Sequence, residues 1–248
     1  FTLRREARWS NGDPVLASDF VTAFRRAMDP ATASGAADLL RAIENAPAIL
    51  GGEKPVEDLG VRALDDYRLE IRLARPVPYF LDILTNTVAS PVHKSSLAVG
   101  GGFSKPGTTI TNGPYRLVDQ APGANIRLAR NPHYWDSSSV TFDEVRYEFV
   151  ADENAEFTRF RAGELDVTNT VPEQRFEQLA SEPDSGLQHR AWLATFYFTF
   201  NTDRGPLHDK PALREALSLA IDRAAITSSV TRAGQVPAFS LVPAGVSN

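Results

Sequence analysis

The residue types that carry catalysis or bind metals stand at no spacing in this sequence that would assemble a reactive centre. Cysteine is absent, which excludes thiol nucleophiles, disulfides and thiolate-bound metals together. The four histidines are dispersed and form no i, i+4 pair. No Gly-x-Ser-x-Gly turn, the nucleophile elbow of many hydrolases, occurs. The sequence therefore predicts no catalytic residue, no metal and no cofactor.

One glycine-rich stretch, at residues 102–109, has the glycine spacing of a phosphate-binding loop. Such a loop needs a lysine directly after its second glycine, because that lysine reaches the phosphates. Thr108 stands at this position, and Pro106 removes one of the backbone N–H groups that would cradle a phosphate. We therefore expect an ordinary loop here.

Adjacent acidic residues occur at Asp65-Asp66 and at Asp152-Glu153. These pairs lie where turns and helix starts are expected, and there carboxylates act as caps and interact favourably with the helix dipole. Paired carboxylates can also hydrolyse glycosides. Nothing in the spacing favours that chemistry, so a hydrolase with two carboxylates stays an alternative.

The composition is that of a globular protein with a substantial core. The 248 residues are 42% hydrophobic and 23% charged, with a formal net charge of −5, which allows one large domain or two ordinary ones. No apolar run approaches the ~20 residues that a membrane-spanning helix needs. No Lys/Arg cluster follows one helical face, so we expect no binding to nucleic acid.

Turn residues and hydrophobic periodicity predict the elements of the first part of the chain. These are a strand, a turn at 9–14, a helix capped by Ser18 or Asp19 and ended by Asp29-Pro30, a helix around 36–44, and a hairpin of 61–64 with 67–73. Strict alternation over 67–73 indicates a strand with one face in water.

The rest of the chain mixes further strands and helices. We expect strands at 114–118, 125–130 and 145–149, a helix at 154–162 ended by Gly163, a strand at 165–167, a short helix around Phe176 and Leu179, a strand at 192–200, and a helix at 211–230. The strand–helix–strand order over 145–167 predicts parallel strands. The apolar and aromatic run at 192–200 predicts a strand buried on both faces. The pattern indicates an α+β fold with mixed sheets.

Six sequence phrases, taken in order along the chain, carry a family resemblance. They are WSNGDPV at 9–15 with DFV at 19–21, LGVRALDD at 59–66 with PVPYF at 76–80, TNGPY at 111–115, RNPHYW at 130–135, FRAGELD at 160–166, and ALSLAIDR at 216–223. Together they resemble the extracytoplasmic solute-binding proteins of peptide ABC importers, the oligopeptide- and dipeptide-binding family. The second phrase is closer to the oligopeptide branch.

The resemblance implies a clamshell fold of the periplasmic-binding-protein type, with an extra subdomain in lobe I. It places that subdomain at residues 1–90, the main part of lobe I at 91–196, and the hinge strand with the start of lobe II at 197–248. It also implies that the chain is a piece with lobe II truncated. Family members begin earlier, with an export signal, and continue well past Asn248.

The resemblance carries few ligand-binding positions over to this sequence. The six positions are Asn169, Thr170, Trp192, Tyr197, Thr199 and Thr231. Thr199 replaces a carboxylate of the family. Thr231 replaces a lysine, for which Arg232 is a candidate substitute.

Other family positions differ, or have two readings. The cleft tyrosines of the family are missing from residues 31–48, where Ala36, Leu39 and Ala42 stand near their places, so we expect the choice of ligand to differ. The aromatic side chains of 192–200 either line the junction of the two lobes or belong to the core.

The function implied is capture of peptides, with oligopeptides expected, and delivery to the membrane permease of an ABC importer. The protein would be a monomer outside the cytoplasm, periplasmic or lipid-anchored at the cell surface, and would catalyse no reaction. Two alternatives stay open. In the first, the same fold binds another solute, such as a nickel chelate, a sugar or an antibiotic-like compound, or serves signalling. In the second, the protein is a hydrolase with paired carboxylates.

Overall fold

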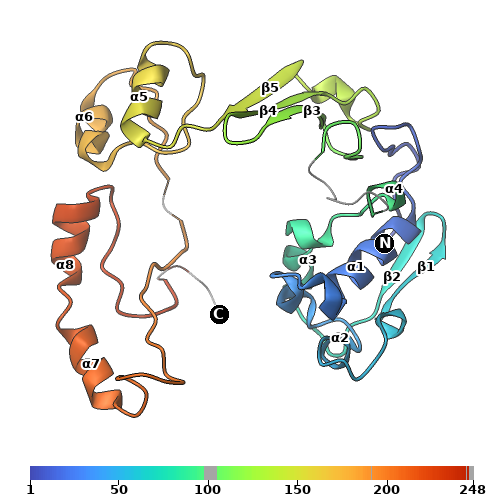
Figure 1. The fold of residues 1–248 in the computed structure, drawn as a ribbon, viewed down its shortest axis with the longest axis horizontal. Helices are drawn as coiled ribbons and strands as arrows, with labels where there is room; N and C mark the ends of the chain where they lie inside the picture. The colour runs from blue at the N-terminus through green and yellow to red at the C-terminus, as the bar shows by residue number, and fades with distance from the viewer. Residues whose placement is uncertain (98–104, 191, 244, 246–248) are drawn as a thin grey trace. The chain divides into compact units, whose positions relative to one another are not determined.

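The computed structural model describes residues 1–97, 105–190, 192–243 and 245 (Figure 1). The chain divides into two units, Phe1–Phe149 and Val150–Asn248. Part of the glycine-rich stretch, residues 102–104, lies outside the described residues. Its remainder forms a turn in which the backbone N–H of Thr108 donates to the carbonyl of Lys105 at 3.2 Å.

In the first unit, the helix α1 (Ala17–Met28) packs on the antiparallel hairpin of β1 (Val61–Asp65) and β2 (Arg68–Ile71). The predicted helix and hairpin are confirmed. Phe24 is 1% exposed and belongs to the core of this layer. The buried residues packed around it include Ala17, Met28, Leu40, Ile43, Ala46, Ile49, Leu59, Val61, Leu69 and Phe80.

The ends of α1 follow the expected turn chemistry, with one shift. The helix begins after Leu16, and the carboxylate of Asp19 in its first turn accepts the backbone N–H of Leu16 at 2.9 Å. At the other end, the Asp29 side chain accepts the N–H of Ala31. Asp19 therefore stabilises the start from inside the helix, whereas the N-cap position itself is occupied by Leu16.

The predicted helix around 36–44 is wrong. The chain forms a 3-10 turn, η2 (Ala37–Leu40), and then a short helix, α2 (Ala46–Leu50). Residues 42–44 are drawn instead into backbone pairing with the end of the hairpin. Ile43 bridges to Leu73, and the N–H of Glu44 donates to the Arg72 carbonyl at 2.9 Å. These long-range hydrogen bonds replace those that a local helix would make.

A three-stranded antiparallel sheet completes the first unit. Its strands are β3 (Tyr115–Ala121), β4 (Asn125–Arg130) and β5 (Glu144–Glu148), in the order β3-β4-β5. Gly123 closes the β3–β4 turn at φ +73°, a conformation that favours glycine. All three predicted strands are confirmed. The short elements between are η1 (Pro30–Thr32), η3 (Val56–Asp58), α3 (Phe80–Ile83), η4 (Thr87–Ala89), α4 (Lys94–Leu97) and η6 (Ser137–Ser139).

In the second unit, the described elements are helical (Figure 1). They are α5 (Glu153–Arg161), η7 (Glu173–Arg175), α6 (Phe176–Ser181), α7 (Pro211–Leu219), α8 (Arg223–Ala225) and the π-helical turn η8 (Ile226–Thr231). The predicted helices at 154–162 and around Phe176 are confirmed. Asp152 caps α5 by accepting the N–H of Ala155, and Gly163 follows its end at φ +75°.

Two predicted strands of this unit are wrong. Residues 165–167 form no strand, Val167 is 81% exposed, and every strand pair among the described residues is antiparallel. Residues 192–200 form no strand either, and the core reading of their aromatics fails for Phe196 and Phe198, which are exposed. A strand needs a neighbour for its N–H and C=O groups. In the described part of the chain, no backbone hydrogen bond involves residues 192–200.

The predicted helix at 211–230 is split in two. Pro211 begins α7, as expected of proline at a first helical position. The helix ends at Leu219, and the Asp222 side chain then caps α8 by accepting the N–H of Ala225 at 2.9 Å. The apolar stripe of α7 is open, since Leu213 and Leu217 are each more than two-fifths exposed. Among the described residues, no helix has the length and apolar character to cross a membrane.

Candidate functional site

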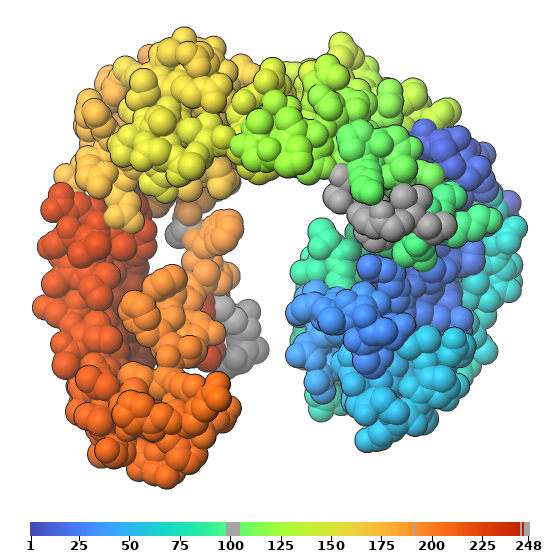
Figure 2. Space-filling view, viewed as in Figure 1, coloured from blue at the N-terminus to red at the C-terminus, as the bar shows by residue number. Residues whose placement is uncertain are grey.

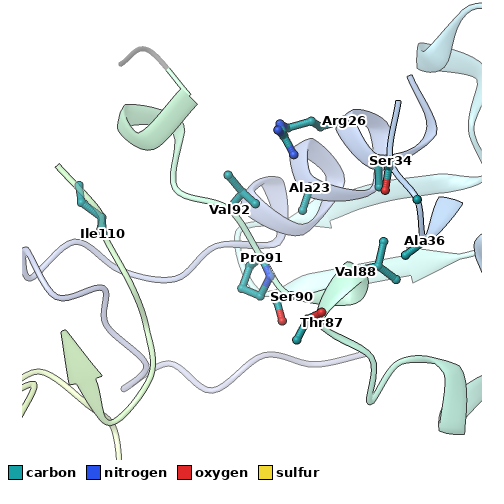
Figure 3. Close-up of a pocket in the computed structure, with 12 residues that line it drawn as sticks. Ala23, Arg26, Ser34, Ala36, Thr87, Val88, Ser90, Pro91, Val92 and Ile110 are labelled. Atoms are coloured by element: carbon teal, nitrogen blue, oxygen red, sulfur yellow. The ribbon is translucent and has the colours of Figure 1, made fainter. Parts of the chain in front are cut away.

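A depression of about 460 Å³ opens on the first unit beside α1 (Figure 3). It is lined by Ala23, Arg26, Ala27, Ser34, Gly35, Ala36, Thr87, Val88, Ser90, Pro91, Val92 and Ile110. This volume lies in the range of small-molecule sites. Most of the lining is apolar, with hydroxyl groups and one guanidinium among it.

The depression exists because one side of it is made of small side chains. Ala23 and Ala27 lie one turn apart on α1 and are buried. The 3-10 turn η1 then ends at Ala33, whose φ of +49° turns the chain. Gly35 and Ala36 follow in the chain and line the same side of the depression as the two alanines of α1. Alanine and glycine leave unfilled the volume that larger side chains would occupy.

The opposite wall is the segment that runs from η4 to residue 92. Asn86 caps η4 by accepting the N–H of Val88 at 3.0 Å. Pro91 fixes the backbone direction after the turn. The N–H of Val92 reaches the carbonyl of Asp19 on α1 at 3.4 Å. This hydrogen bond attaches the wall to α1, the helix that carries Ala23 and Ala27.

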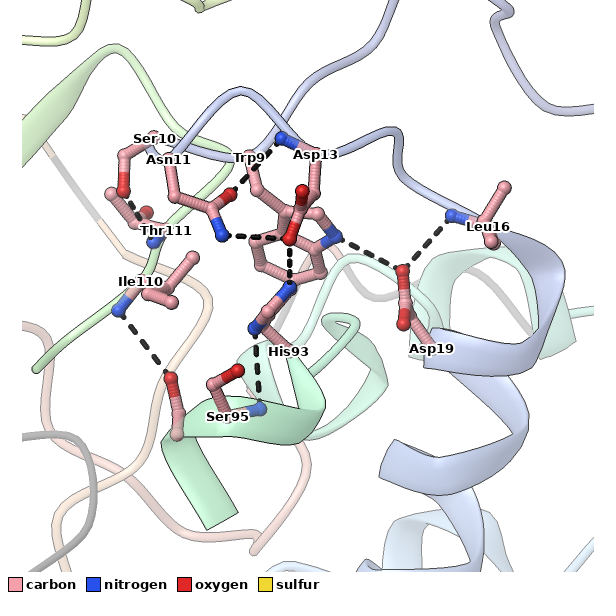
Figure 4. A network of polar contacts seen from close by, with 11 residues as sticks. Trp9, Ser10, Asn11, Asp13, Leu16, Asp19, His93, Ser95, Ile110 and Thr111 are labelled. Atoms are coloured by element: carbon pink, nitrogen blue, oxygen red, sulfur yellow. Dashed lines mark hydrogen bonds and ion pairs between the residues drawn. The ribbon is translucent and has the colours of Figure 1, made fainter. Parts of the chain in front are cut away.

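A polar network that includes the buried side chains of Trp9 and His93 holds the ends of this wall (Figure 4). His93 is 4% exposed, and its Nε2 lies 3.1 Å from Oδ2 of Asp13. Its Nδ1 accepts the backbone N–H of Ser95 at 3.2 Å. Because Nδ1 is occupied as an acceptor, the proton of the neutral ring belongs on Nε2, which donates to Asp13.

Trp9 extends the same network to α1. Its indole N–H donates to the Asp19 carboxylate at 3.0 Å, and its ring meets that of His93 edge-on, with centroids 5.3 Å apart. Nearby, the N–H of Ile110 donates to the hydroxyl of Ser96 at 3.4 Å. The network therefore fixes both Val92 and Ile110, which border the depression, relative to α1.

The network also lowers the pKa of Asp13. The side-chain amide of Asn11 donates to this carboxylate at 2.7 Å and is the main cause that lowers the pKa of Asp13 below its usual range. The hydrogen bond from His93 lowers this pKa further. These hydrogen bonds extend the ionised state of Asp13 to lower pH, and the carboxylate accepts from both neighbours.

The six residues that the resemblance selects all lie in the second unit, outside the depression. Trp192 is 86% exposed and Tyr197 58% exposed, and Thr170 and Thr199 are also exposed. The backbone N–H of Asn169 donates to the Glu156 carboxylate at 3.3 Å. Their role in binding stays a prediction.

Thr231 and its proposed substitute differ in surroundings. Thr231 is half-buried in η8, and its hydroxyl finds no hydrogen-bond partner among the described residues. Arg232 follows at φ +52°, and its Nε donates to the carbonyl of Ser229 at 2.9 Å. One nitrogen of that guanidinium is therefore committed to its own chain.

Neither the depression nor the role of His93 is apparent from the sequence. Ala36 does line the depression, whereas Leu39 and Ala42 do not. The alanines at 23 and 27, one helical turn apart and followed by Gly35-Ala36, were the available indication of a missing volume. No local pattern indicates the network, because His93 and Asp13 are separated by 80 residues.

Comparisons with known proteins place the chain among solute-binding proteins. The family described as bacterial extracellular solute-binding proteins, family 5 Middle, matches residues 1–248. The periplasmic oligopeptide-binding protein OppA of Salmonella typhimurium is 39% identical over 247 residues, which cover 98% of this chain and 45% of that protein. The chain thus spans about half the length of the curated relatives it matches.

Solved structures give the same result. OppA of Burkholderia pseudomallei superposes with a TM-score of 0.93 at 37% identity, covering 99% of this chain and 49% of that one. OppA of Haemophilus influenzae, solved in complex with the peptide RPPGFSPFR, has a TM-score of 0.91 at 34% identity, covering 98% of this chain and 48% of that one. The mixed α/β fold is that of these binding proteins.

Proposed function

This chain belongs to the bacterial extracellular solute-binding proteins of family 5, and on that premise we propose that the protein captures peptides outside the cytoplasm and delivers them to the membrane permease of an ABC importer. The family match over all of residues 1–248 carries the proposal. The similarity to proteins named for oligopeptide binding supports peptides as the ligand. The protein is then a monomer that acts by binding alone, without catalysis, metal or cofactor.

The segment 192–200 supports this proposal in the second unit. Within residues 1–248, the aromatic side chains of this segment other than Phe200 are exposed, and Trp192 and Phe196 are each more than 85% exposed. In the face that Figure 2 shows, the orange region of the second unit that contains this segment is uncovered. Exposed aromatic rings are the side chains that most often dominate binding energy at interfaces.

The remaining site assignments belong to the same proposal. Asn169, Thr170, Thr199 and Thr231 would supply hydroxyl and amide groups for the polar parts of the ligand. The division into an extra subdomain at 1–90, the main part of lobe I at 91–196, and a hinge strand with the start of lobe II at 197–248 is likewise proposed.

Native mass spectrometry of the protein at its full natural length, incubated with a mixed peptide library, tests the proposal. Intact peptides that remain bound would support it. Cleaved products in the solution would support the hydrolase with paired carboxylates instead. If no peptide is retained, the proposal fails, and the same measurement with nickel chelates, sugars and antibiotic-like compounds examines the other-solute alternative.

A further inference from the structure

We propose that Asn112 is a site of spontaneous deamidation, whereas Asn11 is protected from the same reaction by its hydrogen bonds to Asp13. The two asparagines precede Gly113 and Gly12, and these are the two Asn-Gly pairs of the sequence. The inference goes beyond the proposed peptide binding and does not depend on it. It concerns the first unit alone, where all these residues lie.

Deamidation turns an asparagine into an acid through a cyclic imide. The backbone nitrogen of the next residue gives its proton to solvent and attacks the side-chain carbon Cγ, and Nδ2 leaves as ammonia. Water then opens the imide at either carbonyl, which leaves aspartate or isoaspartate. The net change consumes one water and needs no oxidant or reductant. Glycine favours ring closure because it has no Cβ and adopts backbone conformations that other residues avoid, and asparagine is accordingly among the thermolabile residues.

The residues that precede the two Asn-Gly pairs are hydrogen-bonded to each other (Figure 4). The backbone N–H of Ser10 donates to the carbonyl of Thr111 at 2.7 Å, and the N–H of Thr111 donates to the Ser10 hydroxyl at 3.3 Å. Asn11 is exposed, whereas Asn112 is half-buried. Exposure alone would therefore make Asn11 the more reactive of the two, so the contacts of each asparagine decide the order.

Both polar atoms of the Asn11 side chain are held by Asp13 (Figure 4). Nδ2 donates to Oδ2 of Asp13 at 2.7 Å, and Oδ1 accepts the backbone N–H of Asp13 at 3.1 Å. The attacking nitrogen is held as well, because the N–H of Gly12 donates to the carbonyl of Trp9 at 2.8 Å. Attack requires the nitrogen and Cγ to meet in a near-attack geometry. At Asn11 both groups must first leave their hydrogen bonds.

The side chain of Asn112 is held less firmly. In the part of the chain that the structure describes, it makes no hydrogen bond, and it lies in a segment that is neither helix nor strand. The N–H of Gly113 donates to the hydroxyl of Thr111 at 3.1 Å, an acceptor that rotates about its own side-chain bond. Cγ of Asn112 can therefore turn toward the Gly113 nitrogen without breaking a side-chain hydrogen bond.

Peptide mapping by mass spectrometry tests the inference on the protein at its full natural length, incubated in a mildly alkaline buffer. Deamidation at Asn112 should be about tenfold or more faster than at Asn11, because native hydrogen bonds lower the population of reactive conformations at Asn11. In concentrated urea the chain is unfolded, so the two rates should become similar. Enzymatic methylation of isoaspartate provides an independent readout of the product.

Three variants examine the cause of the difference. Gly113→Ala should slow the reaction at Asn112, and the fold should tolerate it, since the added Cβ meets Thr111 Oγ1 at an ordinary 3.5 Å and the φ of Gly113 is not positive. Asp13→Ala removes the acceptor of the Asn11 amide and should speed the reaction at Asn11. The matched control is Asp13→Asn, whose side-chain oxygen still accepts a hydrogen bond and should keep Asn11 protected. Circular dichroism checks that each variant is folded.

Several results would overturn the inference. Equal rates at the two sites in the folded protein, or a faster reaction at Asn11, would contradict it directly. A difference that persists in urea would show that the neighbouring residues in sequence set the rates, and the fold does not. A folded Asp13→Ala variant in which Asn11 reacts as slowly as in the parent would exclude Asp13 as the protecting residue. An unchanged rate at Asn112 in Gly113→Ala would exclude attack by the Gly113 nitrogen.

Discussion

Replacing Trp192 by alanine should weaken peptide binding by about 1–3 kcal/mol while leaving the free energy of unfolding almost unchanged. Within residues 1–248 the side chain is 86% exposed, so it contributes little to the packing of the second unit as this chain forms it. A buried aromatic side chain removes roughly 150–250 Å² from water. A ligand that covers about half of that surface gains about 2–3 kcal/mol at ~25 cal/mol/Å², before the costs of ordering both partners.

The assay combines calorimetric titration with urea unfolding, both on the protein at its full natural length. Phe142→Ala is the matched control, because Phe142 is also a largely exposed aromatic residue and lies outside the proposed site. Unchanged affinity together with a loss of stability would refute the reasoning. That result would place Trp192 in a packed core, as the apolar pattern of 192–200 suggested.

Three further predictions concern the first unit. Phe24→Ala should lower the free energy of unfolding by about 3–5 kcal/mol, measured in urea, because this ring is 1% exposed and packed in the core cluster. His93→Ala should cost about 1–3 kcal/mol in the same measurement, since it leaves a cavity and removes the hydrogen bond to Asp13. Glu70→Gln should be less stable than the parent at pH 7 and equal to it in acid. The hydrogen bond from Arg62 is the main cause that holds the pKa of Glu70 below its ordinary 4.5. Its contribution is complete above that value and disappears as the pH falls through the lower, folded-state pKa.

Each of these predictions has a clear contrary result. His133→Ala, at an exposed histidine, is the control for His93→Ala, and equal effects of the two would show that the network adds no stability. A stability loss of less than about 1 kcal/mol for Phe24→Ala would contradict the tight packing around that ring. For Glu70→Gln, a difference from the parent that persists unchanged down to the lowest pH at which the parent stays folded would show that the ion pair is not its cause.

The elements that sequence analysis predicted correctly are those specified by local chemistry. Alternation and turn residues marked the hairpin of β1 and β2 and the strands β3, β4 and β5, which pair with neighbours close in sequence. Capping residues marked α5. In each case the partner or cap lies near the element in sequence, so the local pattern contains the information.

The failures share one physical cause, which is that the deciding interaction lies far away or outside the local pattern. Residues 36–44 have the composition of a helix, but pairing of Glu44 with Arg72 prevents it. The aromatic run at 192–200 indicates an apolar segment, but the local pattern does not determine which other part of the protein packs against it. The depression beside Ala36 depends on segments brought together by the fold, so only its small side chains could be read beforehand.

The contiguity of β3, β4 and β5 has a consequence for the order in which the chain folds. These strands form one meander from 115 to 148, so each pairing closes a short loop at small entropic cost. The contacts of α1 with β1 join residues separated by a much longer stretch of chain. We therefore expect the meander to gain its native pairings through local search, the β3–β4 hairpin first, since closure of a hairpin generally takes microseconds. The layer of α1 and the β1–β2 hairpin depends on slower encounters between distant segments.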